Sequence, residues 1–234
     1  MNEFVSTRRA LILAAGSAAA GALMLSGCGK NSDEAEVTAN EDLMREHGII
    51  RRALFVYTEA ARRVRQDPAK MPLGSLAETA KLFRQFGEDY HERALEEENI
   101  FPVVRKLKTP VARLPDILQT QHQRGREITD YILRVASRDT IGASEAERFT
   151  ATLDAFVAMY GPHAAREDTE LFPAWKKALG DKAYDEMGDK FEDIERRTFG
   201  HDGFEDALGR IAKIEQDFGL TDLAVVTAPS PTGG

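Results

Sequence analysis

The chain has one cysteine among its 234 residues, Cys28. One thiol cannot form an intramolecular disulfide, so a framework of disulfides or of cysteine-bound metal is excluded. Basic residues are also in deficit, with 31 Lys and Arg against 39 Asp and Glu, a formal net charge of −8 and a pI of about 5.3. This acidic balance argues against a nucleic-acid partner, whose phosphates need a basic face. Phosphate-binding glycine loops and nucleophile elbows are absent, and the body contains no apolar run long enough to span a membrane.

The first residues read as an export signal. Arg8 and Arg9 precede an apolar run rich in Ala and Gly, from Ala10 to Leu25, which is the pattern of a signal peptide over residues 1–27. An uncleaved N-terminal anchor helix is the alternative interpretation.

The end of this signal resembles a bacterial lipobox, with the order Leu25-Ser26-Gly27-Cys28. The resemblance implies cleavage before Cys28 and lipidation of its sulfur, so we expect a membrane-anchored lipoprotein that faces the periplasm or the cell exterior. The segment from Thr7 to Ile12 further resembles a twin-arginine signal, while ordinary Sec export remains open.

The remaining chain divides into four regions. Residues 28–40 are polar and are expected to form a tether, residues 41–179 a helical bundle, residues 180–220 a helical extension and residues 221–234 a flexible tail. Sustained period-two alternation, the mark of a half-buried strand, is missing throughout.

Four long helices are expected in the bundle. The first starts after Asn40 and ends before Pro68; the second opens with a Ser75-x-x-Glu78 capping box; the third starts near Leu114; the fourth opens with a Ser144-x-x-Glu147 capping box. Because the connections are short, we predict an all-α fold, an antiparallel four-helix bundle with one or two additional C-terminal helices packed on its outside.

Three of the five histidines fall inside apolar helical stripes. They are His47, His122 and His163, on the first, third and fourth helices. A single core histidine commonly bonds to a backbone carbonyl, but four inward histidines with carboxylates beside them would be intolerable in a core without a cation.

The fourth inward histidine belongs to a repeated motif. His91 is followed by Glu96 and by Phe101-Pro102, and about seventy residues later His163 is followed by Glu167 and by Phe172-Pro173. A histidine and a glutamate one helical turn apart direct both side chains at one point, as a metal site inside a helical bundle requires.

These motifs resemble those of the hemerythrin-like, or HHE cation-binding, domain family, over about residues 40–179. The resemblance implies a four-helix bundle around a non-haem di-iron centre, in which two glutamates bridge the metals. Carried over position by position, the implied metal ligands are His47, His91, Glu96, His122, His163 and Glu167. The resemblance also extends to the segment around Gly200-His201-Asp202-Gly203, which is similar to the C-terminal extension of one bacterial HHE group.

Two features depart from the family pattern. The second-helix histidine and glutamate are five residues apart instead of four, which on a regular α-helix turns Glu96 about 140° away from His91. We favour a π-bulge between Ala94 and Glu96, and the alternatives are that Glu98 takes the role or that this helix supplies only His91. Position 126 is Arg where oxygen-carrying hemerythrins have a second histidine, which favours a coordination position open to a small molecule.

The expected cofactor is therefore iron, two ions per chain, with manganese or zinc left open because ligand type alone does not select among them. We expect a binding protein that senses, stores or scavenges oxygen, nitric oxide or iron. The alternatives are a di-iron oxidase or peroxidase acting on a small reductant or peroxide, and a structural lipoprotein. No catalytic residue, protein partner or redox partner is indicated.

Other polar and aromatic residues receive simpler interpretations. His201 is expected in a loop without a metal role, and Tyr57, Tyr90 and Tyr160 as core aromatics. The run of glutamates at 96–98 is expected to contain one inward carboxylate and two solvated ones.

Overall fold

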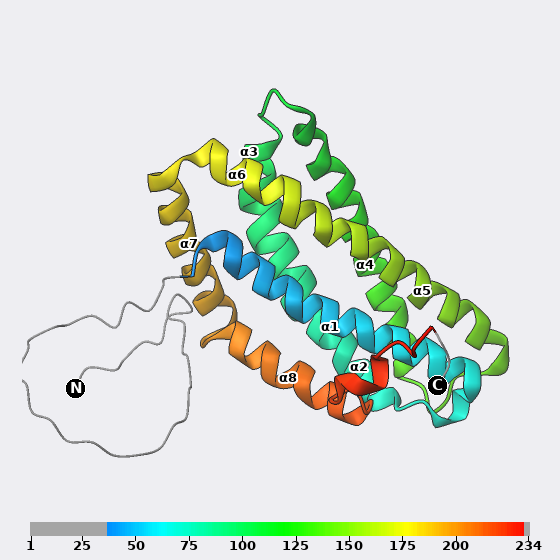
Figure 1. Cartoon of the computed structure of the whole chain (residues 1–234). Helices are drawn as coiled ribbons and strands as arrows, with labels where there is room; N and C mark the ends of the chain where they lie inside the picture. Colours follow the sequence, from blue (N-terminus) through cyan, green and yellow to red (C-terminus); the bar gives the residue numbers. More distant parts are fainter. Residues whose placement is uncertain (1–36, 232–234) are drawn as a thin grey trace, which may run out of the picture.

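The computed structural model describes residues 37–231, and within that range every regular element is a helix. The four long helices of the bundle run alternately up and down (Figure 1). They are α1 (Ala39–Gln66); α2 (Leu73–Leu82), continued by η2 (Phe83–Ile100) and α3 (Phe101–Val104); α4 (Leu114–Ala136); and α5 (Ala143–Arg166), continued by η4 (Glu167–Leu171) and α6 (Phe172–Leu179). Three short 3₁₀ turns, η1 (Pro68–Lys70), η3 (Pro110–Arg113) and η5 (Leu223–Val226), lie in the connections and near the C-terminus. The predicted all-α bundle is confirmed.

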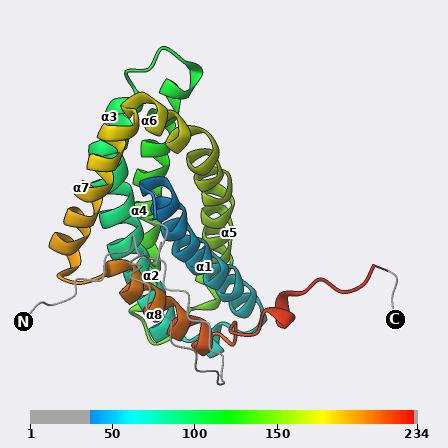
Figure 2. The same cartoon turned by 60° about the vertical axis from the view of Figure 1, so that its left-hand side comes forward.

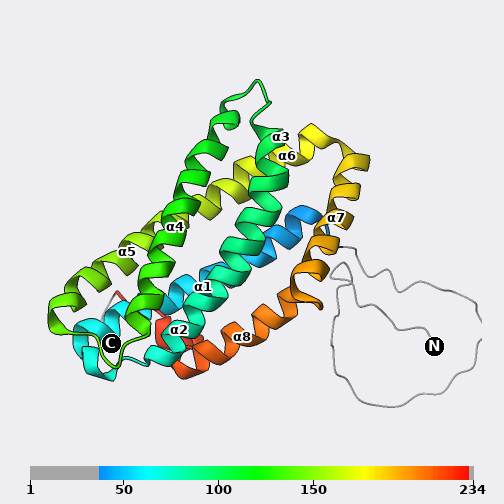
Figure 3. The ribbon, with the colours of Figure 1, turned by 180° about the vertical axis from the view of Figure 1, so that it is seen from behind.

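Two further helices form the C-terminal extension. Helix α7 (Asp181–Phe199) turns back along η2 and α8 (Gly203–Asp217) crosses the far end of the bundle, as the views in Figures 2 and 3 show. The indole of Trp175 on α6 stacks on Phe191 of α7, with ring centroids 5.6 Å apart, and an ion pair joins Arg52 of α1 to Glu215 of α8. The extension therefore covers the side of the bundle formed by α1 and η2.

The helix starts differ from those predicted. α1 begins one residue before Asn40, where Thr38 and Glu41 form a reciprocal capping box. The boxes predicted at Ser75 and Ser144 are wrong: α2 begins at Leu73 and α5 at Ala143, both without a side-chain cap. The hydroxyl of Ser75 instead donates to Asp217, and the first turn of α2 follows Pro72.

An aromatic cluster packs in the core of the bundle and reaches the histidines at Tyr160, whose ring centroid lies 5.1 Å from that of His163. Tyr57, Phe83, Phe156 and Tyr160 are buried, and their neighbouring ring centroids lie 5.0–5.9 Å apart, mostly tilted or edge-on. The tyrosines interpreted as core aromatics, Tyr90 included, are buried. Such packing contributes beyond simple burial and fixes the spacing of the four helices.

The export signal, Cys28 and most of the tether lie outside the described residues. Val37 and Ala39 are buried, so the packed body begins before the predicted end of the tether at residue 40. The predicted tail contains the short turn η5. Among the described helices, none is long and apolar enough to cross a membrane.

Candidate metal centre

Four histidines from four different helices converge inside the bundle. His47 on α1, His91 on η2, His122 on α4 and His163 on α5 are all nearly fully buried. They form two pairs: the Nε2 atoms of His47 and His91 lie 3.0 Å apart, and those of His122 and His163 lie 3.1 Å apart. The hypothesis that each helix contributes one inward histidine agrees with this geometry.

Two glutamates lie between the histidine pairs. Glu96 has one oxygen 3.5 Å from the Nε2 of His91 and the other 3.4 Å from the Nε2 of His122. Glu167 has one oxygen 3.4 Å from the Nε2 of His47 and the other 3.1 Å from the Nε2 of His163. Each carboxylate thus spans both pairs, with one oxygen directed to each.

A π-helix brings Glu96 into this position. All of η2, 18 residues long, has the wide i to i+5 register, and the N–H of Phe101 donates to the carbonyl of Glu96. The predicted local widening is present, but it extends over the whole segment instead of one bulge. Glu98, the alternative carboxylate, is exposed.

A second π segment, η4, follows Glu167 and was not predicted. Here the N–H of Phe172 donates to the carbonyl of Glu167, as Phe101 does to Glu96. Both π segments end at a Phe-Pro pair. A proline has no N–H to complete the α-helical ladder, so a wider register costs less at these two places.

The other ring nitrogen of each histidine is held by an oxygen acceptor. The Nδ1 atoms of His47, His91, His122 and His163 lie 2.6 Å from Asp168, 2.6 Å from Glu46, 2.9 Å from Glu97 and 2.8 Å from Gln121, respectively. An Nδ1–H donated to such a partner leaves the Nε2 lone pair directed inward, which is how proteins orient histidines that bind metals.

These oxygen acceptors were missed in the sequence, although a signal for them exists. Each is the chain neighbour of another inward residue: Glu46 precedes His47, Glu97 follows Glu96, Gln121 precedes His122 and Asp168 follows Glu167. The expectation that Glu97 is solvated is wrong, because it accepts hydrogen bonds from both His122 and Arg126.

The chemistry of the cluster fits a bound cation. None of the four carboxylate oxygens of Glu96 and Glu167 accepts a hydrogen bond from any described residue, although both side chains are fully buried. Two inward lone pairs 3.0 Å apart repel each other, whereas neighbouring ligands about 2.1 Å from one metal ion are separated by about that distance. Leaving such acceptors unpaired in a core costs several kcal/mol, and a cation between them removes the cost.

Without a metal, protons must hold the cluster together. Burial and the charge of Glu167 raise the pKa of Glu96, whereas His163, His122 and His47 hold the pKa of Glu167 well below its ordinary value in spite of burial. Although burial opposes it, the neighbouring carboxylates raise the pKa of His91 well above 6.5. Metal binding therefore competes with protons.

A network of further buried polar groups lies beside this cluster. The hydroxyl of Tyr160 donates to Glu92, and the guanidinium of Arg126 contacts Glu97 at 2.6 Å and Glu92 at 3.4 Å. Glu92 and Glu97 also gather near His122, but the positive charge of Arg126 already neutralises that group. Arg126 therefore stabilises the carboxylate that orients His122.

A further buried carboxyl is held by groups other than the four histidines. Glu88 is fully buried, accepts a hydrogen bond from Thr129 and lies 2.9 Å from the Nε of Arg84. Burial and the charge of Glu92 raise its pKa from 4.5 to about 8.

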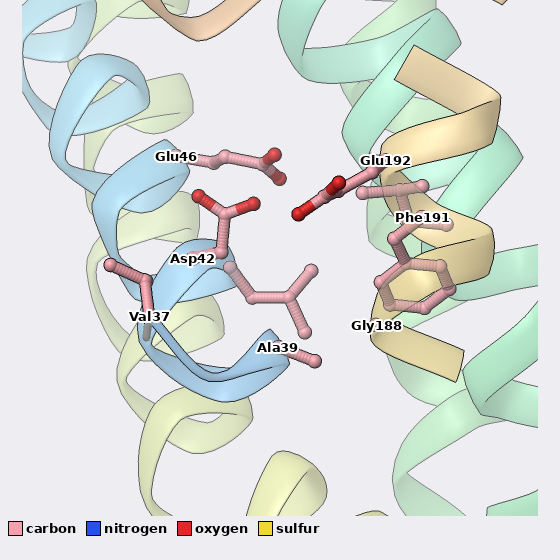
Figure 4. Close-up of a pocket in the computed structure, with 9 residues that line it drawn as sticks. Val37, Ala39, Asp42, Glu46, Gly188, Phe191 and Glu192 are labelled. Carbon is pink, nitrogen blue, oxygen red and sulfur yellow. The ribbon is translucent and has the colours of Figure 1, made fainter. Parts of the chain in front are cut away.

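Two further features lie at the surface of the molecule. His201 is exposed in the loop before α8, as predicted. A small pocket lies between the start of α1 and α7, where the carboxylates of Asp42, Glu46 and Glu192 point toward one another (Figure 4). Glu46 lines this pocket and also accepts a hydrogen bond from His91, so the pocket is connected to the first histidine pair through one side chain.

Comparison with known proteins agrees with this geometry. The model of the hemerythrin HHE cation-binding domain matches residues 38–175. The chain is 38% identical over 231 residues to the uncharacterized proteins Mb2018 of Mycobacterium bovis and Rv1995 of Mycobacterium tuberculosis, covering 92% of this chain and 89% of each relative. No solved structure gives a significant match. The chain belongs to the hemerythrin HHE cation-binding domain family.

Proposed function

We propose that the protein holds two iron ions at this centre and binds, senses or scavenges a small molecule such as oxygen or nitric oxide, or iron itself, at the cell envelope. The observation that carries the proposal is the placement of Glu96 and Glu167, each with one oxygen directed to each histidine pair and none of these oxygens hydrogen-bonded to the described residues.

Each histidine pair with its two carboxylate oxygens makes one four-donor site. His47 and His91 share the first site, His122 and His163 the second. Bound ferrous ions would supply electrons. They would also supply open coordination positions for a small ligand, because iron held by nitrogen and oxygen donors commonly accepts more than four of them. The chain's own contribution is to direct the Nε2 atom of each imidazole inward by holding its Nδ1 atom with an oxygen acceptor.

The surroundings of the two sites restrict what enters. Phe172 stacks on His47 and Phe101 on His122, with ring centroids 5.5 Å apart in both cases. These buried rings cover the imidazoles of His47 and His122, which supports a small ligand over a large substrate.

Metal analysis with optical spectra tests this function. Purified protein should contain about two irons per chain, and its spectrum should change on exposure of the anaerobic ferrous form to oxygen or nitric oxide. Substituting His47, His91, His122 or His163 by Ala should lower the iron content, whereas the exposed His201→Ala should not. Iron content independent of all four inward histidines would refute the proposal, and manganese or zinc in its place would correct the metal.

A di-iron oxidase or peroxidase is the second candidate, and one observation favours it. The buried phenol of Tyr160 donates a hydrogen bond to Glu92 while its ring packs against His163, with centroids 5.1 Å apart, so a hydroxyl group lies beside the second site. Catalytic turnover of peroxide or a small reductant that falls in Tyr160→Phe would favour the enzyme. A reversible spectral change without product favours the binding protein.

The envelope location is a separate proposal and rests on the sequence around Cys28. We propose that Cys28 is acylated and becomes the mature N-terminus. Cys28→Ser should release the protein from membrane fractions or leave the precursor uncleaved. Processing and fractionation identical to those of the wild type would exclude a lipoprotein.

A further inference from the structure

Asn99 joins the π-helix to the C-terminal extension. It lies on η2 and is 8% exposed. Its Nδ2 donates to the carbonyl of Ala94 at 2.7 Å, and its Oδ1 accepts from the Nζ of Lys190, on α7, at 2.6 Å. Ala94 stands two residues before Glu96, so this contact acts on the turn that carries the bridging carboxylate.

The bond from Asn99 to Ala94 depends on the π register. On a regular α-helix, residues five apart differ in direction by about 140°, so a side chain at 99 would face away from the carbonyl of 94. The wide turn of η2 brings the two together. The bond therefore forms only in the conformation that also directs Glu96 toward both histidine pairs.

A carboxamide at position 99 fits both of its partners, the carbonyl of Ala94 and the ammonium of Lys190. A backbone carbonyl only accepts hydrogen bonds and an ammonium only donates them, and a carboxamide does both. Lys190 fixes the oxygen of Asn99 on its own side and so leaves the NH₂ group for Ala94. An aspartate at 99 would keep the contact with Lys190 and place an acceptor against the carbonyl of Ala94.

Further contacts with η2 fix the position of α7 so that Lys190 can reach Asn99. Near its C-terminal end, Phe199 packs edge-on against Tyr90 of η2 at 5.1 Å and contacts Phe86 at 6.2 Å between centroids. Residues 190 and 199 of α7 thus face residues 99 and 90 of η2, so the two helices are antiparallel neighbours. Because α7 follows the last residue matched to the family domain, at 175, this contact belongs to the extension.

We propose that Asn99 and Lys190 are positioning residues: they hold the π turn at Ala94 and thereby keep Glu96 between the two histidine pairs. The C-terminal extension is in this way part of the metal centre. The inference rests on the proposed metal binding, and it makes the site dependent on a lysine outside the family domain.

Cobalt(II) binding to the metal-free full chain tests the inference. Wild type should bind two cobalt ions per chain with a visible ligand-field spectrum. Asn99→Asp and Lys190→Met should bind more weakly and with an altered spectrum, by up to about 10–100-fold, the loss expected when a group that orients a metal ligand is removed. Lys190→Arg, which keeps a donor, should restore most of the affinity. Lys182→Met, on the exposed face of the same helix, is the matched control and should bind like wild type.

Hydrogen exchange gives a second measurement that needs no metal. Amides of residues 95–101 should exchange faster in metal-free Asn99→Asp and Lys190→Met than in wild type, while those of α4 remain unchanged. If Asn99→Asp fails to fold, Lys190→Met decides, because Lys190 is on the surface. Wild-type protein that binds no cobalt would overturn the metal proposal and this inference together. Wild-type binding of two ions with equal affinity in both variants would overturn this inference alone.

Discussion

Glu96 and Glu98 are two residues apart, yet one is fully buried between the histidine pairs and the other is exposed. We predict that Glu96→Gln lowers the iron content clearly below two per chain, because an amide nitrogen replaces one of the two bridging oxygens and cannot bind a metal. Glu98→Gln changes the same charge on the same helix and is the matched control. Metal analysis of both variants decides, and equal losses would mean that charge alone governs iron retention.

Glu88 allows a prediction about pH. Its pKa rises from 4.5 in the unfolded chain to about 8 in the fold, so the folded state binds the proton more tightly. The free energy of unfolding therefore falls as pH rises between these two values. The largest possible loss is about 1.4 kcal/mol for each unit by which the pKa is shifted. Glu88→Gln should match wild type near pH 5 and become progressively more stable than it toward pH 9 in thermal unfolding. A stability difference that does not change with pH would contradict this assignment.

The sequence predicts the inward side chains well and their hydrogen-bonding partners poorly. His47, His122 and His163 are recognisable because each interrupts an apolar stripe, a pattern that belongs to one helix. Glu46 and Asp168 lie on the flanks of their helices, where charged residues are usually solvated. Only the packing of one helix against the next shows that they face a histidine, so single-helix periodicity does not identify them.

At the scale of elements, Gly125 of α4 faces the side chain of Tyr160 on α5. A Cβ at this position would lie 2.7 Å from the hydroxyl of Tyr160, which donates to Glu92. Gly125→Ala should therefore destabilise the protein by about 1–3 kcal/mol, as overpacking does. Gly161→Ala on α5, with open space around it, should be neutral or stabilising by up to about 1 kcal/mol. Denaturant unfolding compares the two variants. Equal effects on stability would contradict a close contact between position 125 and Tyr160.

The elements themselves were predicted unequally. The five-residue spacing from His91 to Glu96 indicated a departure from α geometry, and η2 confirms it. The four-residue spacing from His163 to Glu167 fits a regular helix, so η4, which begins only at Glu167, gave no such signal. The capping boxes predicted at Ser75 and Ser144 are wrong because α2 and α5 begin before these serines. Their N-terminal residues, Leu73 and Ala143, directly follow Pro72 and Gly142.

At the scale of the whole molecule, the site joins side chains from all four helices of the bundle. Ligands from separate helices come together only in the folded chain, so metal binding adds directly to the free energy of folding. One site contributes about 2.7 kcal/mol when the free metal concentration is a hundred times the dissociation constant of that site. For a chain of this size, that corresponds to an increase in melting temperature of about 5–10 °C.

We therefore predict that chelation of iron lowers the melting temperature by at least this amount. The difference between the metal-bound and metal-free forms should narrow as pH falls, because the raised pKa of His91 and His122 means that protons displace the metal at a pH where free histidine is still neutral. Calorimetry of both forms from pH 8 to pH 5 measures this. A variant with His47→Ala and His163→Ala, one residue from each pair, is the control and should melt at the same temperature with and without iron. If the wild-type protein also melts at one temperature in both forms, the four histidines bind no metal that contributes to the fold.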